Sequence, residues 1–209
     1  MTLSTPNIFR RLSGTPDITR LKRTKTALLM IEFQAEHFTG VLPVDNREAL
    51  TAAAVKAMDW ADKNKILTVH VYHQAKSPAS LAFAPDSSGA AFYPPIIPRK
   101  KHLTQVKYAA SAFSGSPLHT ILQTEGIDTL ILAGLSTPSA ITASAHDARV
   151  LGYKCLTAAD LTASRDVVSW DESRVIPAVK MQETALANIA DKYAQVLSLA
   201  EIMSLPIEK

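Results

Sequence analysis

The chain has 209 residues, of which 47% are apolar. This is enough for one domain with a sizeable hydrophobic core, but the chain is short for two domains. Its net charge of +3 is spread along the sequence, and the one dense basic cluster, PRKKH at 98–102, looks like a solvated loop rather than a nucleic-acid module. A single cysteine and the absence of a long apolar run favour a cytoplasmic protein with no membrane or nucleic-acid partner.

The first predicted elements follow an N-terminal arm. Residues 1–23 show little periodicity and are expected to lie on the body or on a neighbouring subunit, while residues 24–209 form a single domain. TALLMIEF at 26–33 is a continuous apolar run typical of a parallel strand covered on both faces. After a loop, a helix is expected over 47–65, with Asp45 or Asn46 as its cap. Its broad apolar stripe includes Leu50, Val55, Met58 and Trp60.

The middle of the chain predicts a second strand and a long connection. ILTVHVYH at 66–73 reads as another buried strand, and the Pro-rich and Ser-rich loop that follows runs to about residue 103. Loops of that length are uncommon in compact domains and often serve as lids or interfaces. SPLHTILQTEG at 116–126 has Ser116 as cap, Pro117 at its first position and Gly126 beyond its end, which indicates a helix.

The last third predicts another strand, helix, strand unit. IDTLILAGL at 127–135 is apolar throughout, a helix follows from about residue 138 to 151, and YKCLTAAD at 153–160 is the next strand. A final helix at 177–193 precedes an edge strand at 194–199 and a terminal helical turn. Strands that alternate with helices predict an α/β fold with a doubly wound parallel sheet. Its ligand site is expected at the carboxyl ends of the strands, where the loops after Phe33, before Ser111 and after Leu135 converge.

Two charged residues stand out at this expected site. Glu32 interrupts an apolar strand near its carboxyl end, and a buried carboxylate there needs a partner. Lys107 in VKYAASAF is the candidate partner. Taken singly, each residue reads more simply as a surface charge or a structural ion pair.

The turn after residue 135 is where many α/β enzymes carry a nucleophile. A helix start there would supply backbone N–H groups and a favourable dipole for an oxyanion. The chain offers Ser136, Thr137, Ser139 and then Ala140. Ser and Thr at a helix start are usually caps, and no histidine has a spacing that would supply a base.

Several segments in the right order resemble the isochorismatase-like superfamily, also called the cysteine hydrolases, from about residue 26 onward. ALLMIEFQAEHF is similar to the family's ALLVIDxQxxF, KYAASAFSGSPL to its lysine followed by SAFxGTxL, and GIDTLILAGLSTPSAITASAHDARVLGY to GIDTLxLAGxxTxxCVxxTAxDAxxxGY. LTASRD at 161–166 matches a further segment, and Gln182 stands where a histidine is frequent. The resemblance implies a Rossmann-like three-layer sandwich with a mostly parallel, roughly six-stranded sheet, commonly assembled as a dimer or tetramer.

The resemblance also implies roles for the site residues. Glu32 takes the position of the catalytic aspartate, Lys107 that of the catalytic lysine and Ala140 that of the nucleophilic cysteine. Ala140 has no heteroatom, so covalent thiol catalysis is impossible there. Cys155 lies in the following strand and reads as a small buried apolar residue. The residues expected to contact a substrate are Gln34, Phe38, Phe113, Ser136, Thr137 and Ser139.

No metal or nucleotide cofactor is expected. The nicotinamidase branch of the superfamily needs an Asp and His cluster after the second strand, whereas VYHQAKSPASLAF holds His73 alone. His146 reads as a surface or interface residue. The loop QAEHFTG after the first strand is not a glycine-rich phosphate loop.

Three functions stay open at this stage. The first is thiol-free hydrolysis of a small amide, imine or vinyl-ether metabolite, in which a Glu32 with a raised pKa would donate a proton to a vinyl ether, although Lys107 would oppose that. The second is a catalytically silent relative with a ligand-binding or scaffolding role. The third and weakest is a substitute nucleophile, Ser136 or Ser139.

Overall fold

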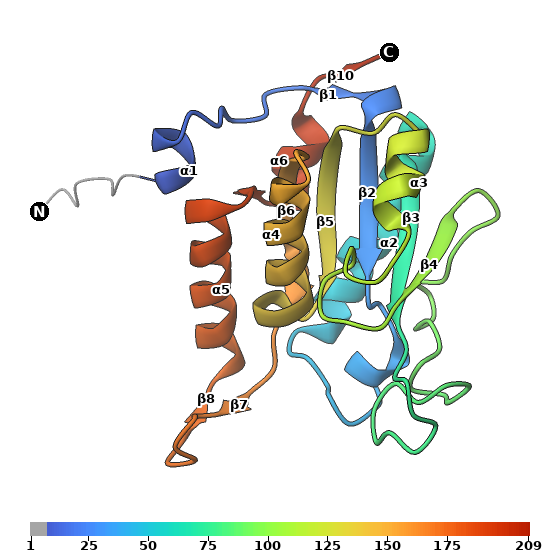
Figure 1. The fold of residues 1–209 in the computed structure, drawn as a ribbon, viewed down its shortest axis with the longest axis vertical. Helices are drawn as coiled ribbons and strands as arrows, with labels where there is room; N and C mark the ends of the chain where they lie inside the picture. Colours follow the sequence, from blue (N-terminus) through green and yellow to red (C-terminus); the bar gives the residue numbers. More distant parts are fainter. Residues whose placement is uncertain (1–7) are drawn as a thin grey trace, which may run out of the picture.

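The computed structural model describes residues 8–209, and six parallel strands form its central sheet (Figure 1). Their order is β4-β3-β2-β5-β6-β9, so the chain winds outward from β2 in both directions. The strands are β2 (Thr26–Ile31), β3 (Leu67–His73), β4 (Leu103–Lys107), β5 (Thr129–Leu135), β6 (Lys154–Ala163) and β9 (Gln195–Leu197). Every neighbouring pair is parallel, which confirms the predicted α/β fold.

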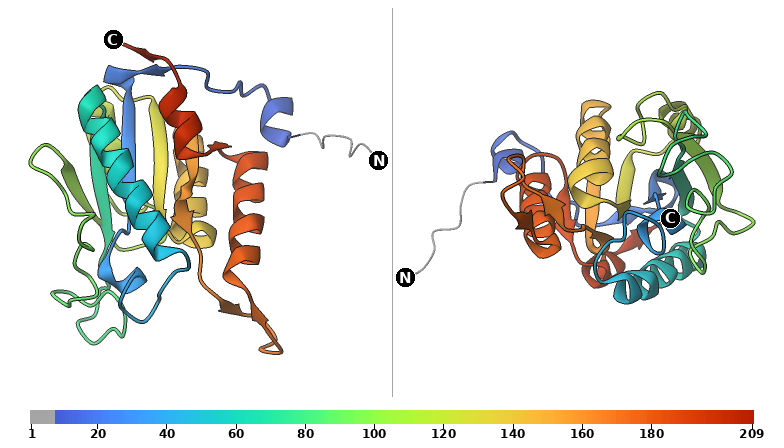
Figure 2. Two further views of the ribbon diagram at one scale, coloured as in Figure 1. Left: turned by 180° about the vertical axis from the view of Figure 1, so that it is seen from behind. Right: turned by 90° about the horizontal axis from the view of Figure 1, so that it is seen from below.

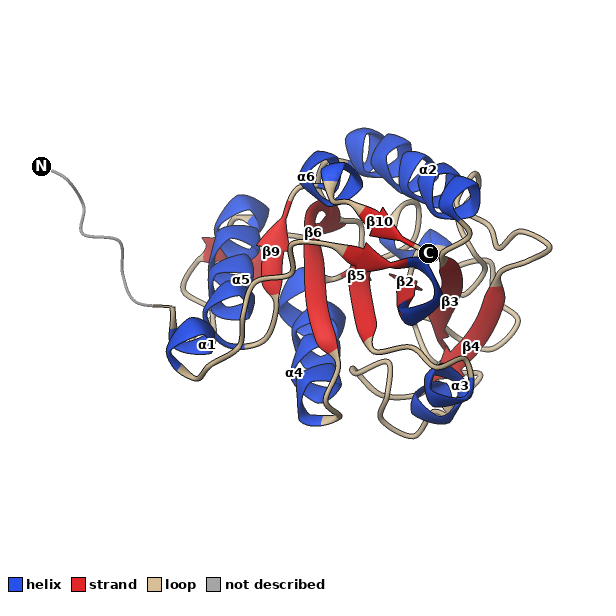
Figure 3. Ribbon diagram, turned by 90° about the horizontal axis from the view of Figure 1, so that it is seen from above, coloured by secondary structure: helices blue, strands red, loops and turns tan. Residues whose placement is uncertain are grey.

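Helices cover both faces of this sheet and make three layers, as the view from above shows (Figure 3). One face carries α2 (Arg47–Asn64) and α6 (Leu199–Ser204). The other carries α3 (Leu118–Thr124), α4 (Thr142–Val150) and α5 (Ala178–Lys192). Among residues 8–209, no helix is long and apolar enough to cross a bilayer.

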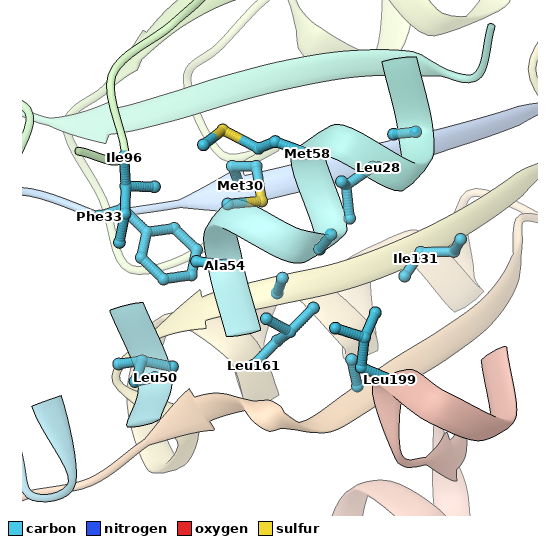
Figure 4. Close-up of a cluster of buried hydrophobic side chains, with 14 of the residues drawn as sticks. Leu28, Met30, Phe33, Leu50, Ala54, Met58, Ile96, Ile131, Leu161 and Leu199 are labelled. Atoms are coloured by element: carbon cyan, nitrogen blue, oxygen red, sulfur yellow. The ribbon is translucent and has the colours of Figure 1, made fainter. Parts of the chain in front are cut away.

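Each helical layer packs a separate apolar cluster against the sheet. Figure 4 shows the cluster under α2 and α6, where Leu50, Ala54 and Met58 of α2 and Leu199 of α6 face strand residues such as Met30. These α2 positions follow the i, i+4, i+8 spacing of one helix face. The opposite cluster joins α3, α4 and α5 to the other side of the same strands. Because the central strands β2 and β5 are buried on both sides, each reads as an almost unbroken apolar run.

The predicted ends of the elements differ from the structure where local chemistry intervenes. Asn46 does precede α2, but its backbone is left-handed and neither its side chain nor that of Asp45 caps the helix. Asp45 Oδ1 instead accepts the N–H of Asn46. The helix expected from residue 138 begins as a π-helical turn, Thr137–Ile141, before α4 starts. Strand β4, at the end of the long loop, was not predicted.

The N-terminal arm lies on the body of its own chain (Figure 2). It includes α1 (Phe9–Leu12) and β1 (Leu21–Lys22), and β1 pairs in parallel with β10 (Ile207–Glu208) at the other end of the chain. Residues 1–7 of the predicted arm lie outside the described residues. A short hairpin, β7 (Val167–Val168) and β8 (Val175–Ile176), projects between β6 and α5.

Candidate active site

The carboxyl ends of four neighbouring strands bring the predicted site residues to one edge of the sheet. Lys107 ends β4, His73 ends β3, Glu32 directly follows β2, and the turn with Ala140 follows β5. Glu32 has a left-handed backbone, with φ of 55°. Such a conformation is costly for a residue other than glycine, and it turns the side chain away from the path of the strand.

Glu32 and Lys107 form the buried ion pair that the sequence suggested. Lys107 reaches past β3, its side chain is fully buried, and Nζ pairs with Glu32 Oε1. Nζ also donates to the carbonyl oxygens of Ala109 at 2.7 Å and Ala110 at 2.9 Å. A lysine ammonium has three protons to donate, so these three acceptors satisfy it fully.

His37 holds the other oxygen of the same carboxylate. Its Nε2 lies 3.0 Å from Glu32 Oε2, and its Nδ1 lies 3.3 Å from the carbonyl oxygen of Leu42. Burial raises the pKa of Glu32, but the hydrogen bond from His37 and the charge of Lys107 outweigh it and hold that pKa below its usual value. Glu32 is therefore an ionised carboxylate at neutral pH.

Two aromatic contacts close this cluster on the loop side. Phe83, from the long loop, packs edge-on against His37 on one side and against His73 on the other, with ring centres 5.3 and 5.1 Å apart. His73 Nδ1 is buried and makes no hydrogen bond within the described residues. Burial, reinforced by the charge of Lys107, lowers the pKa of His73 and keeps it neutral.

The turn after β5 places Ala140 among apolar neighbours. Ala140 is buried in the cluster that includes Val71, Ala112 and Phe113. Thr137, which precedes it, donates to the carbonyl oxygen of Ala163 and lies 2.5 Å from Gln182 Oε1.

Gln182 lies on α5, at the position where the resemblance places a frequent histidine. Its Oε1 also accepts from the Ser164 hydroxyl, and its Nε2 donates to Thr162. Gln182 therefore ties the turn to β6.

The predicted substrate-contacting residues divide into three groups. Gln34 is fully buried and its amide is engaged by backbone: Nε2 donates to the carbonyls of His73 and Ala90, and Oε1 accepts from the N–H of His73. Phe38 and Phe113 are buried and stack on Tyr93 and Tyr153. Ser136 is half-buried and Ser139 exposed, and among the described residues neither hydroxyl bonds to a histidine. The assignment of these residues, with Thr137, to substrate contact stays a prediction.

A cavity of about 480 Å³ lies at the opposite edge of the sheet from the candidate site. It is lined by residues at the amino ends of β5, β6 and β9, including Thr129, Lys154 and Gln195, and by the arm. The charged cluster at the carboxyl ends of the strands, and not this cavity, holds the buried ionised groups that acid–base chemistry requires.

Within residues 8–209 no group of three or more His, Cys, Asp or Glu side chains is arranged to hold a metal ion. His146 lies on the surface, where it was predicted, and Cys155 is buried.

His37 is the site residue that sequence reasoning missed. It stands within the quoted motif QAEHF but follows no strand or helix periodicity, because it sits on a short 3₁₀ turn, Ala35–His37. The sequence did contain one indication of its role. His37 is a polar residue that lies five positions after the strand-end carboxylate of Glu32, where the chain folds back.

Comparison with known proteins shows the family to which the chain belongs. The family model described as Isochorismatase domain matches residues 26–201. A secreted isochorismatase effector of Verticillium dahliae is 24% identical over 93% of this chain and 98% of its own. A maleamate amidohydrolase of Pseudomonas putida is 30% identical over 68% of this chain and 73% of its own.

The fold is shared with solved structures as well. The crystal structure of an isochorismatase from Pseudomonas putida matches with a TM-score of 0.85 at 28% identity, covering 94% of this chain and 98% of that one. The matched region of the family model contains β2, β4 and the turn after β5, and so includes the whole candidate site. The chain belongs to the isochorismatase family of hydrolase-like proteins.

Proposed function

We propose that this protein is a thiol-independent hydrolase of small amides, with Glu32 as the general base that activates water. The observation that carries the proposal is the buried Glu32–Lys107 pair at the carboxyl edge of the sheet. A buried ion pair costs desolvation energy and is weak evidence for a stabilising role. The strained backbone of Glu32 adds a further cost of order 1–3 kcal/mol, a pattern typical of functional sites.

The charge state of Glu32 favours an amide or imine over a vinyl ether. Cleavage of a vinyl ether needs a protonated acid, whereas the pKa of Glu32 is lowered and its carboxylate is ionised. An ionised carboxylate can remove a proton from water. A raised pKa of Glu32, the condition for cleavage of a vinyl ether, is not met, because His37 and Lys107 outweigh the effect of burial.

The reaction would proceed without a covalent intermediate. Glu32 takes a proton from water while the water oxygen bonds to the amide carbon and the C=O electrons move to oxygen. The oxygen electrons then re-form the C=O bond as the C–N bond breaks, and the proton on Glu32 passes to the leaving nitrogen, which gives a carboxylic acid and an amine or ammonia. Lys107 keeps Glu32 ionised, and Ala140, at the position where the resemblance places the family's cysteine, offers no nucleophile that could compete with the water.

The relative from Pseudomonas putida supports the substrate class. Its name assigns it to maleamate, a small amide that carries a carboxylate. Maleamate is therefore the first compound to test, together with other small amides, imines and vinyl ethers.

One observation favours a second candidate, a catalytically silent relative. The Lys107 ammonium is already saturated by Glu32, Ala109 and Ala110, so it has no proton left for a substrate oxyanion. The Glu32 side chain is only 9% exposed. A role limited to ligand binding or scaffolding would leave this arrangement undisturbed.

An activity screen with matched variants separates the two candidates. Wild-type protein should release ammonia from at least one amide of the panel, and Glu32→Gln should abolish that release while circular dichroism shows an intact fold. Glu36→Gln is the control, because Glu36 is equally buried but bonds only to backbone N–H groups of Val41 and Phe83. Turnover that survives Glu32→Gln would eliminate the base role. If no compound is turned over, the catalytically silent relative is the candidate that remains.

A further inference from the structure

His37 has no role of its own in the reaction proposed above. The ring is buried, and its two nitrogens face two different oxygen atoms, Glu32 Oε2 and the carbonyl oxygen of Leu42. A carbonyl oxygen can only accept a hydrogen bond, and so can an ionised carboxylate. A neutral imidazole has one N–H and cannot serve both.

Counting protons leaves two arrangements that satisfy every contact. Either both ring nitrogens carry a proton and Glu32 is ionised, which is the arrangement that agrees with the lowered pKa of Glu32, or the proton has moved from Nε2 to Glu32 Oε2 and Nδ1 alone stays protonated. In both, one proton lies between His37 and Glu32 in addition to the one on Nδ1. A third arrangement, with the proton on Nε2 alone, turns the lone pair of Nδ1 toward the Leu42 oxygen and is repulsive.

We infer that His37 is the positioning residue of the Glu32 base: it holds the carboxylate through a proton that the two residues share. This inference rests on the proposed function. With Lys107 on Oε1 and His37 on Oε2, each oxygen is held by one donor and keeps one lone pair for water. Because both residues contact the shared proton, replacing either one changes the protonation of the other.

The surroundings of the pair contain no second carboxylate among the described residues. Lys107 of β4 and His73 of β3 are the other titratable groups that face it, and His73 is neutral. Glu36, on the same turn as His37, points the other way and accepts from Val41 and Phe83. The ring of His37 itself is fixed by the edge-on contact with Phe83.

Two substitutions separate holding the carboxylate from sharing the proton. His37→Gln keeps an N–H donor but cannot titrate. His37→Leu removes both. We expect His37→Leu to lower kcat roughly 100-fold with KM unchanged, since a displacement on the order of 1 Å costs that much and His37 does not touch substrate. His37→Gln should recover kcat to within about tenfold of wild type and should remove one ionisation from the pH profile.

A spectroscopic arm decides the inference without any turnover. In protein labelled with ¹⁵N-histidine, we expect both ring nitrogens of His37 to carry protons at pH 7, and Glu32→Gln to convert the ring to the form protonated at Nδ1 alone. His37→Gln identifies the signal, and His146→Gln, which changes an exposed residue, is the control.

The outcomes keep this inference distinct from the proposed function. A ring protonated at Nε2 alone would overturn the shared proton, whatever the activity. If the enzyme hydrolyses an amide and His37→Leu keeps the wild-type kcat and pH profile, the positioning role is wrong and the function stands. If no amide is hydrolysed but the ring shows the expected response to Glu32→Gln, the proton sharing stands and the proposed reaction fails.

Discussion

At the scale of single residues, the chemistry of this chain depends on where its few reactive groups are buried. Cys155 is the only thiol. Burial raises its pKa to about 12, with only a minor opposing effect of Arg149. A thiol in that environment is neither a nucleophile nor a target for reagents.

Iodoacetamide should therefore leave the native protein unmodified at pH 8, and should modify one site when urea unfolds the chain. Ser139→Cys is the positive control, because residue 139 is exposed on the turn of the candidate site. Mass spectrometry of the treated protein measures both. Rapid modification of Cys155 in the native protein would contradict its buried, protonated state and reopen thiol chemistry.

His70 is a second buried group with a measurable consequence. It lies in β3, fully buried, and its Nε2 is 3.0 Å from Nδ1 of His102, which in turn contacts Asp62. Burial, with smaller contributions from the charges of His102 and Arg99, lowers the pKa of His70 from 6.5 to about 3. Between about pH 6.5 and pH 3, His70 is therefore protonated in the unfolded chain and neutral in the folded chain.

Stability should consequently fall on acidification. The contribution of His70 is complete above pH 6.5 and is lost below it at about 1.4 kcal/mol per pH unit, or about 2 kcal/mol by pH 5. Urea unfolding at pH 7 and pH 5 measures the loss, and His70→Gln should flatten it. The exposed His146→Gln should keep the wild-type slope. Equal slopes for all three proteins would refute the shifted pKa.

At the scale of elements, the contact of β2 with β5 sets the geometry of the site. Ile31, the last residue of β2, pairs with Gly134 of β5, one step before Glu32. Gly134 has φ of 141°, and a Cβ there would stand 2.0 Å from the carbonyl oxygen of Ile31. Only glycine lets the two strands approach so closely.

Gly134→Ala should cost at least about 3 kcal/mol, because a buried clash adds to an unfavourable backbone conformation. Gly152→Ala is a matched control: φ is 89° there, but nothing lies within 4 Å of the new methyl group, so the cost should be about 1 kcal/mol. Urea denaturation of both variants gives the comparison. Similar losses would show that strain alone, and not the close approach, requires Gly134.

The elements that could be predicted from the sequence are those with strong local patterns. β2 and β5 are almost unbroken apolar runs, β3 is a run of apolar and β-branched residues interrupted by His70, and α5 has clear flanks, so their positions agree with the structure to within about two residues. The two-residue strands β1 and β10 have no periodicity to detect. They exist because segments at the two ends of the chain pair with each other, which local patterns cannot show.

The candidate site divides in the same way. Glu32 and Lys107 were predictable, because a charge in an apolar strand needs a partner and strand ends converge. His37 was not, since its place beside Glu32 depends on a 3₁₀ turn and on the long loop that carries Phe83. The engagement of Gln34 by three backbone groups depends on the same loop.

At the scale of the whole molecule, several expectations stay predictions. Light scattering would check the dimer or tetramer, and fractionation of source cells would check the cytoplasmic location. The sequence predicts a boundary at residue 23 between the arm and the domain. The arm nevertheless contributes to the hydrophobic core, because Leu21 is 1% exposed and packs in the cluster under α2.

Arg10 fastens this arm to the body. Its side chain is 4% exposed, and it bonds to Asp17 at 2.7 Å and to the carbonyl oxygen of Ala190 at the end of α5. Arg11 binds the other oxygen of Asp17 at 2.8 Å, but its side chain is 54% exposed. The two neighbours thus share one carboxylate and differ in burial and in the contact with α5.

Arg10→Ala should therefore loosen the arm, and Arg11→Ala should not. Loss of Arg10 leaves Asp17 half-paired and empties a buried site, at a cost of about 2 kcal/mol once the one-third exposure of Asp17 is allowed for. Loss of Arg11 should cost less than about 1 kcal/mol, as for exposed ion pairs. Urea unfolding measures both costs, and brief trypsin treatment should cut the arm of Arg10→Ala faster than that of Arg11→Ala while the sheet stays intact. Equal stability and equal cleavage would mean that the pairing of β1 with β10, and not Arg10, holds the arm in place.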